Sequence, residues 1–90
     1  MSALSSRDRF AADLVAWINR KLAPPGTLVD STTPLFAGGL INSIRILEII
    51  AWVERAIGRR VTDPEIRMDN FRTVERIAHV FVAEASHVEA

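Results

Sequence analysis

The sequence predicts an all-α fold, a bundle of four helices with a long first connection and a short third helix. Three segments of the chain repeat apolar residues at helical spacing. Proline and glycine residues separate these segments. The chain has 90 residues, of which 49% are apolar, so it can form one small domain over residues 1–90 with a core shared by a few helices.

The first helix is expected from about residue 6 to residue 22. Ser5 or Ser6 can accept the free N–H groups at its start, and the run 24–26, Pro-Pro-Gly, ends it. Its apolar residues form one stripe, which we assign to the core: Phe10, Leu14, Trp17, Ile18 and Leu22.

A connection of about twenty residues, 23–42, follows the first helix. Loops of this length are uncommon in compact domains and are usually functional or locally structured. Residues 30–34 have the composition of a turn. Four apolar residues are expected to pack the connection against the body of the protein: Leu28, Val29, Leu35 and Phe36.

The second helix is expected from Ser43 to Ile57, with Gly58 ending it. Its apolar arc is wider than one buried side needs. Trp52 projects away from the core stripe, where it would either anchor a partner or cover the loop or the third helix. We assign one part of the arc to the core: Ile46, Ile49, Ile50, Val53 and Ile57.

A short third helix and a longer fourth helix complete the prediction. Asp63 can cap a helical turn that begins at Pro64 and reaches about residue 68. Thr73 can cap the last helix, which is expected to run to about Ala85. The core stripe of this helix is expected to contain Val74, Ile77, Ala78, Phe81 and Ala85.

Composition excludes several classes of function. The chain has no cysteine, so it has no disulfide, thiolate metal site or cysteine nucleophile. Basic and acidic residues balance at 11 each, which argues against a nucleic-acid partner. No apolar run has the length of a transmembrane helix or a signal peptide, so we expect a soluble cytoplasmic protein without a membrane partner.

The candidate site is the stretch from Gly38 to Ile44. Two glycines allow a tight turn, and two apolar residues after them can fix that turn to the core. Asn42 can then cap the second helix, and Ser43 lies in its first turn near the positive end of the helix dipole. A phosphodiester on Ser43 would be well placed there. The alternative is that Asn42 and Ser43 form a plain helix cap.

The sequence contains no group that would activate Ser43. His79 and His87 are far from it in the chain, and no triad or metal-ligand spacing is present. The glycine that a nucleophile elbow needs two residues after the serine is absent. We therefore expect a serine that another enzyme modifies, and not an enzyme; a small serine hydrolase is disfavoured because the base is missing.

Four segments together resemble the acyl carrier protein family: 30–36 (DSTTPLF), 39–44 (GLINSI), 46–50 (ILEII) and 70–77 (NFRTVERI). That family has a long loop ending in Gly-x-x-Asp-Ser-Leu, an apolar second helix, a short third helix and a closing fourth helix. The resemblance implies that a phosphopantetheinyl transferase attaches 4′-phosphopantetheine from coenzyme A to Ser43. The terminal thiol of this arm would then hold a cargo as a thioester, which explains how a chain without cysteine could carry one.

The chain departs from the family pattern in two respects. Asn42 stands where the family has aspartate, which keeps the cap and removes a negative charge. The balanced charge also differs from strongly acidic members, so partners are less expected to rely on a basic patch. The form Gly-Leu-Ile-Asn-Ser is similar to that of free-standing carriers of specialised or aminoacyl pathways.

The resemblance also implies partners and a surface for them. Beside the transferase, these are a ligase that loads an acyl or aminoacyl group and downstream transferases, with the carrier a monomer when alone. The implied docking surface lies beside the arm and consists of Ile44, Arg45, Leu47, Glu48, Ala51 and Arg55. Leu47 could instead pack under the long loop. The alternative function is a helical protein-interaction domain that never carries an arm.

Overall fold

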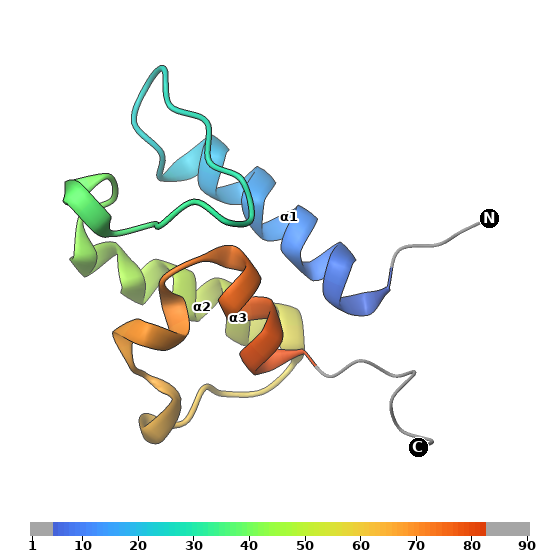
Figure 1. The fold of residues 1–90 in the computed structure, drawn as a ribbon. Coiled ribbons are helices and arrows are strands. Elements are labelled where there is room, and N and C mark those ends of the chain that lie inside the picture. Colours follow the sequence, from blue (N-terminus) through green and yellow to red (C-terminus); the bar gives the residue numbers. More distant parts are fainter. Residues whose placement is uncertain (1–4, 83–90) are drawn as a thin grey trace.

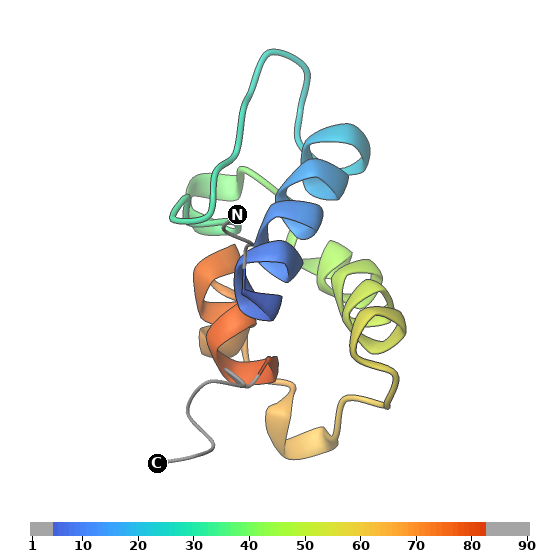
Figure 2. The ribbon, with the colours of Figure 1, turned by 90° about the vertical axis from the view of Figure 1, so that its right-hand side faces the viewer.

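Three α-helices form the body of the fold in the computed structural model, which describes residues 5–82. They are α1 (Ser6–Lys21), α2 (Ile46–Ile57) and α3 (Val74–Phe81), and the residues described include no strand. Figure 1 shows α1 crossing above α2 and α3, with the long connection at the far end of α1. Figure 2 shows from the side that α2 and α3 lie on opposite sides of α1. The predicted all-α class is confirmed.

Four short 3₁₀ turns connect these helices. They are η1 (Ala37–Gly39), η2 (Ser43–Arg45), η3 (Asp63–Glu65) and η4 (Met68–Phe71). The expected short third helix is therefore two separate turns among the described residues. The break lies at Ile66, with φ −85° and ψ 80°, and at Arg67, which is extended. These conformations interrupt the helical path, so η3 and η4 do not merge into one helix.

The predicted start of α1 agrees with the structure, and so does its core stripe except for Trp17, which is only partly buried. The hydroxyl of Ser5 accepts the N–H of Asp8 at 3.0 Å, which caps the first turn. The buried residues of the helix are Phe10, Leu14 and Ile18, and Leu22 follows them into the core.

The aromatic side chain of Trp52 packs on α1. Its ring centroid lies 5.3 Å from that of Phe10 and 6.2 Å from that of Trp17. Both tryptophans are only partly buried. Trp52 therefore covers the first helix, which neither of the expected roles included.

The second helix begins differently from the prediction. Its first turn, η2, is a 3₁₀ turn, and the α-helical part starts at Ile46; such turns are frequent at helix N-termini. The helix ends at Gly58, which has φ 75° as a left-handed C-cap. Its buried residues are Ile49, Ile50 and Val53, whereas Ile46 and Ile57 are partly buried at the core margin.

The last helix begins as expected at Thr73, whose hydroxyl accepts the N–H of Arg76 at 3.0 Å. All four described members of its predicted stripe are buried: Val74, Ile77, Ala78 and Phe81. The helix ends at Phe81 and Val82 is extended, with φ −121° and ψ 115°, so the prediction that the helix runs to about Ala85 is wrong. Ala85 and His87 themselves lie outside the described residues.

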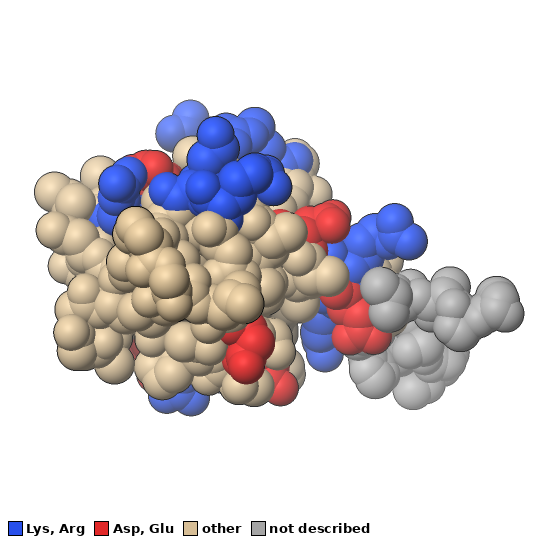
Figure 3. Space-filling model, turned by 90° about the horizontal axis from the view of Figure 1, so that it is seen from above, with Lys and Arg blue, Asp and Glu red and all other residues tan. Residues whose placement is uncertain are grey.

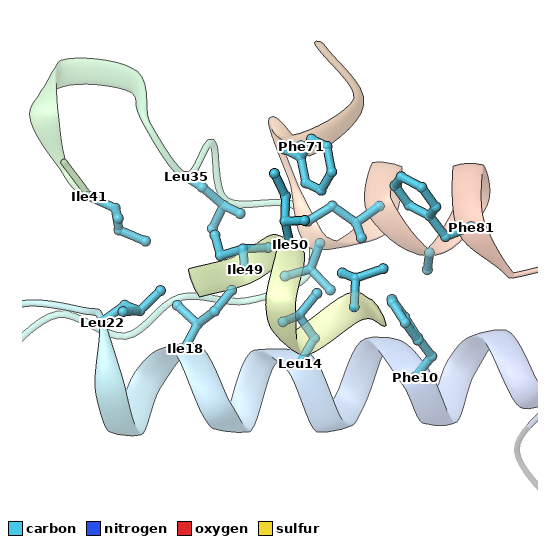
Figure 4. Packing of buried hydrophobic residues seen from close by; sticks show 14 of the residues in the cluster. Phe10, Leu14, Ile18, Leu22, Leu35, Ile41, Ile49, Ile50, Phe71 and Phe81 are labelled. Carbon is cyan, nitrogen blue, oxygen red and sulfur yellow. The ribbon is translucent and has the colours of Figure 1, made fainter. Parts of the chain in front are cut away.

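The long connection is anchored to α1 and to the segment between η4 and α3. The side-chain amide of Asn19 pairs with the backbone of Val29, donating to its carbonyl at 2.9 Å and accepting its N–H at 2.8 Å. The N–H of Leu35 donates to the carbonyl of Arg72 at 2.8 Å. Figure 4 shows side chains from the connection converging with those of α1 and α2, including Leu35 and Ile41.

The prediction that four apolar residues anchor the connection is partly wrong. Val29 and Leu35 are buried and Phe36 is partly buried, but the side chain of Leu28 is 82% exposed. The pairing of Asn19 with Val29 turns Val29 inward, and its neighbour then faces solvent. No helix among residues 5–82 has the length and apolar character needed to cross a membrane.

Candidate functional site: a serine at the start of the second helix

Two left-handed glycines form the turn that leads to the candidate serine. Gly38 has φ 64° and Gly39 has φ 76°, a region that side-chain-bearing residues rarely adopt. After them, Leu40 is partly buried and Ile41 is 2% exposed. The N–H of Ile41 donates to the carbonyl of Leu35 at 3.1 Å. The turn is therefore fixed to the core two residues before Ser43, as the sequence predicts.

Asn42 caps the second helix. Its side-chain oxygen accepts the N–H of Ile44 at 3.0 Å, and its backbone is extended with φ −61° and ψ 131°. Its carbonyl accepts the N–H of Arg45 at 2.9 Å. An aspartate could accept the same hydrogen bonds. Asparagine and aspartate at this position therefore differ in charge and not in the geometry of the cap.

Ser43 is the first residue of η2 and is exposed. Its hydroxyl makes no hydrogen bond to any residue in the range 5–82. Space around the preceding turn is open, since a Cβ placed on Gly38 or Gly39 would meet no atom within 4 Å. A large group on this hydroxyl would extend into solvent beside a helix start, where partial positive charge favours an anion.

The predicted docking residues form an exposed row beside Ser43. The side chains of Ile44 and Leu47 are 68% and 65% exposed, so the alternative in which Leu47 packs under the loop is wrong. Ala51 is half-buried and Arg55 is exposed one and two turns further along. The structure brings these residues to one face because they follow each other at intervals of three and four.

Some of the charged side chains around this row have a partner of opposite charge and others do not. Arg45 and Glu48 form an exposed ion pair with an Nη1–Oε2 distance of 2.6 Å. The carboxylate of Glu54 accepts the N–H of Val61 at 2.9 Å instead of pairing with a cation. Arg55 has no ion pair within the described part of the chain. Viewed from above, the largest group of Lys and Arg atoms lies along the upper edge of the molecule, and smaller groups lie at its right and lower edges (Figure 3).

A second polar cluster fixes the end of the second helix to η3. Arg59 donates two hydrogen bonds to the carboxylate of Glu65, each 3.0 Å long. The N–H and hydroxyl of Thr62 donate to the same carboxylate at 2.8 and 2.9 Å. The hydrogen bonds from Arg59, followed by those from Thr62, lower the pKa of Glu65 to about 2. This cluster closes a turn and is not adjacent in sequence to Ser43.

The described histidine does not share an element with the serine. His79 lies on α3, where it lines a shallow depression with Arg72 and Arg76. His87 lies outside the described residues. Residues 5–82 also contain no group of three side chains that could hold a metal ion.

One feature that sequence reasoning missed is a cavity between the long connection and η4. It is lined by Pro34, Phe36, Ala37, Met68, Asp69 and Arg72. Its two walls are about thirty residues apart in the chain. No local pattern could have predicted it, because it depends on how the connection packs against η4.

Comparison of the chain with protein-family models, with curated proteins and with solved structures found no match.

Proposed function

We propose that this chain is a carrier protein of the acyl-carrier type, which holds an acyl or aminoacyl group as a thioester on a 4′-phosphopantetheine arm at Ser43. The observation that carries the proposal is the exposed, unbonded hydroxyl of Ser43 directly after a glycine turn fixed to the core. The family resemblance of the surrounding segments supplies the identity of the arm. The proposal also includes the fold: a four-helix bundle of acyl-carrier type in which η3 and η4 take the place of the short third helix.

The residues present fit such an arm. Attachment requires that Ser43 Oγ attack the phosphorus bearing pantetheine in coenzyme A; the new P–O bond forms as the bond to 3′,5′-ADP breaks. The hydroxyl proton passes to a base of the transferase, since no residue in the range 5–82 bonds the Ser43 hydroxyl. The phosphodiester gains the favourable field of the helix start. The chain itself catalyses no step in this proposal.

The row beside Ser43 is the docking surface of the proposed carrier. Ile44 and Leu47 provide exposed apolar area. Ala51 lies between them and Arg55, and its small side chain does not protrude from the surface. Partners are the phosphopantetheinyl transferase, a loading ligase and downstream transferases. Each would approach the same face because each must reach the arm, and the carrier would act as a monomer in the cytoplasm between these encounters.

The deciding experiment is transfer from coenzyme A by a broad-specificity phosphopantetheinyl transferase, followed by intact mass. The mass should rise by one phosphopantetheine for the wild type. Ser43→Ala should abolish the rise, and the exposed Ser6→Ala should retain it as a matched control. No mass change with several transferases would refute the carrier proposal.

A second candidate is a helical interaction domain without an arm, since the exposed Ile44 and Leu47 would serve that role equally well. It predicts no mass change with coenzyme A. It also predicts that Ser43→Ala leaves partner binding unaltered, whereas a carrier would lose all cargo transfer.

A further inference from the structure

Two tryptophan side chains form an aromatic pair at the solvent margin of the contact between α1 and α2. The ring centroids of Trp17 and Trp52 lie 6.2 Å apart, and the two rings are tilted by 31°. Phe10, which is 7% exposed, supports Trp52 with its ring edge-on at a centroid distance of 5.3 Å. Both tryptophans stay only partly buried. The pair therefore presents indole surface to solvent and is held in place by packing.

Such a pair is suited to anchor a partner protein. Tryptophan is among the residues that most often contribute the largest share of the binding energy at protein interfaces. Because the rings of Trp17 and Trp52 already restrict each other, less side-chain entropy is lost when a partner covers them. The exposed indole area is thus available for binding without a large ordering cost.

Three exposed cations flank the pair. Arg20 and Lys21 follow Trp17 by three and four residues, so they lie one turn further along α1. Arg55 follows Trp52 by three residues and lies one turn further along α2. None of the three forms an ion pair within the described part of the chain. Each lies in the last turn of its helix, where the helix dipole also favours a cation, and the outward charge stays available to a partner.

The directions of the two helices place these cations on opposite sides of the pair. Figure 1 shows α1 and α2 running in opposite directions across the view, so one turn further along each helix leads toward opposite ends. A helical turn rises about 5.4 Å, so Arg20 and Arg55 are separated by roughly two turns along the helices. An extended segment of a few residues spans that distance. The spacing therefore fits a peptide segment better than a small ion.

Carboxylates near the pair offset only part of this positive charge. Glu48, one turn before Trp52, is bound to Arg45. Asp13, one turn before Trp17, forms no ion pair among residues 5–82 and offsets one of the three cations. The surface therefore keeps a positive excess, and the partner surface that complements it is acidic.

We propose that the pair of Trp17 and Trp52 binds an acidic segment of a partner protein. An apolar side chain of that segment covers the indoles, and its carboxylates lie beside Arg20 and Arg55. The inference goes beyond the proposed carrier function, because it needs no arm on Ser43. Arg55 also belongs to the row beside Ser43, so one partner can cover both surfaces. The charges steer the encounter and the indoles supply contact area, so binding should weaken as the salt concentration rises.

Single-stranded nucleic acid is the competing polyanion, since bases also stack on aromatic rings. Three separated cations are fewer than the roughly six to ten phosphate contacts that DNA-binding proteins commonly make. The whole chain also has equal numbers of basic and acidic residues, 11 each. An acidic peptide segment is therefore favoured over a nucleic acid.

The test selects dodecapeptides from a random phage-displayed library on the unmodified protein. We expect the enriched peptides to combine Asp or Glu residues with an apolar residue. A synthetic enriched peptide without tryptophan is then titrated against the protein by fluorescence. The chain has two tryptophans and no tyrosine, so the tryptophan emission reports this pair alone. The emission should shift with saturation, and the Kd should rise about tenfold or more for Arg20→Glu and for Arg55→Glu.

Arg67→Glu is the matched control, because it makes the same change in net charge on the exposed segment between η3 and η4. It should retain the wild-type Kd, and circular dichroism should show that all three variants are folded. The inference is overturned by a selection without enriched peptides, by enriched peptides without acidic residues, or by binding that leaves the emission unchanged. An equal Kd for the wild type and Arg20→Glu, or tighter binding of oligothymidylate than of the peptide, also overturns it. The carrier proposal is decided separately, by the mass measurement with coenzyme A.

Discussion

The side-chain oxygen of Asn42 accepts the backbone N–H of Ile44 at 3.0 Å and so caps the helix whose first residue is the candidate attachment serine. Because the side chain of Asn42 is neutral, this hydrogen bond stabilises the turn without a negative charge at the helix start. Asn42→Asp should keep the bond and add a negative charge at the helix start, which is worth about 0.3–1 kcal/mol at low ionic strength. Thermal unfolding should therefore show an equal or higher midpoint.

The same substitution separates recognition by the transferase from stability. The acyl carrier family has aspartate at this position, so Asn42→Asp should raise the rate of modification by a broad-specificity transferase. Asn42→Ala removes the cap and should cost about 1 kcal/mol in the free energy of unfolding. An unchanged rate for Asn42→Asp would show that the transferase does not read this charge.

A substitution in the proposed docking surface beside Ser43 should weaken cargo loading of the proposed carrier without unfolding the protein. Leu47 is 65% exposed, so Leu47→Asp removes apolar contact area and leaves the core untouched. The loading rate should fall at least tenfold while the circular dichroism spectrum stays the same. Leu28→Asp is the matched control, since Leu28 is also exposed but lies on the long connection, and its loading rate should not change.

A charge in the core should instead unfold the protein. Ile50 is 8% exposed and lies on the buried face of α2, so Ile50→Asp places a carboxylate among apolar side chains. The cost of several kcal/mol is comparable with the whole stability of a domain of this size. The spectrum should lose its helical signal at 25 °C. A folded variant would place Ile50 at the surface and contradict the described packing.

Acid should weaken the fold through Glu65. The hydrogen bonds from Arg59 and Thr62 lower its pKa from 4.5 to about 2, so the folded state binds its proton less readily than the unfolded state does. The stabilisation is present above pH 4.5 and is lost as the pH falls towards 2. In urea unfolding, Glu65→Gln should be less stable than the wild type at pH 6, and the difference should shrink by pH 2.

A matched control tests whether this effect is specific. Asp13 is exposed in the middle of α1, away from the helix ends, and its side chain makes no ion pair in the described part of the chain. Asp13→Asn should therefore follow the wild type across the same pH range. If the difference in unfolding free energy between the wild type and Glu65→Gln stays constant with pH, the side chain of Glu65 stabilises the turn through its hydrogen-bond geometry and not through its charge.

Helical periodicity predicted the buried faces of α1 and α2 because side chains three and four residues apart share one face of a helix. Burial in the long connection was harder to predict, since two adjacent apolar residues there cannot both face the core. The contact with Asn19 decides that Val29 turns inward and Leu28 outward. The cavity was beyond prediction for the same reason, because its walls meet only through tertiary packing.

The pairing of Asn19 with Val29 gives the last prediction. Asn19→Ala removes both partners of a buried residue's backbone N–H and carbonyl, which should cost about 1–3 kcal/mol in the free energy of unfolding. Amide hydrogen exchange should accelerate at Val29 and also at Leu35, because the connection loses its anchor to α1. Asn70→Ala is a useful comparison, since its side chain donates to the carbonyl of Glu65 outside the connection and should leave exchange at Val29 unchanged. Equal exchange at Val29 in the wild type and Asn19→Ala would mean that burial of Val29 and Leu35 alone holds the connection, and the turn before Ser43 would then depend on core packing and not on this pair.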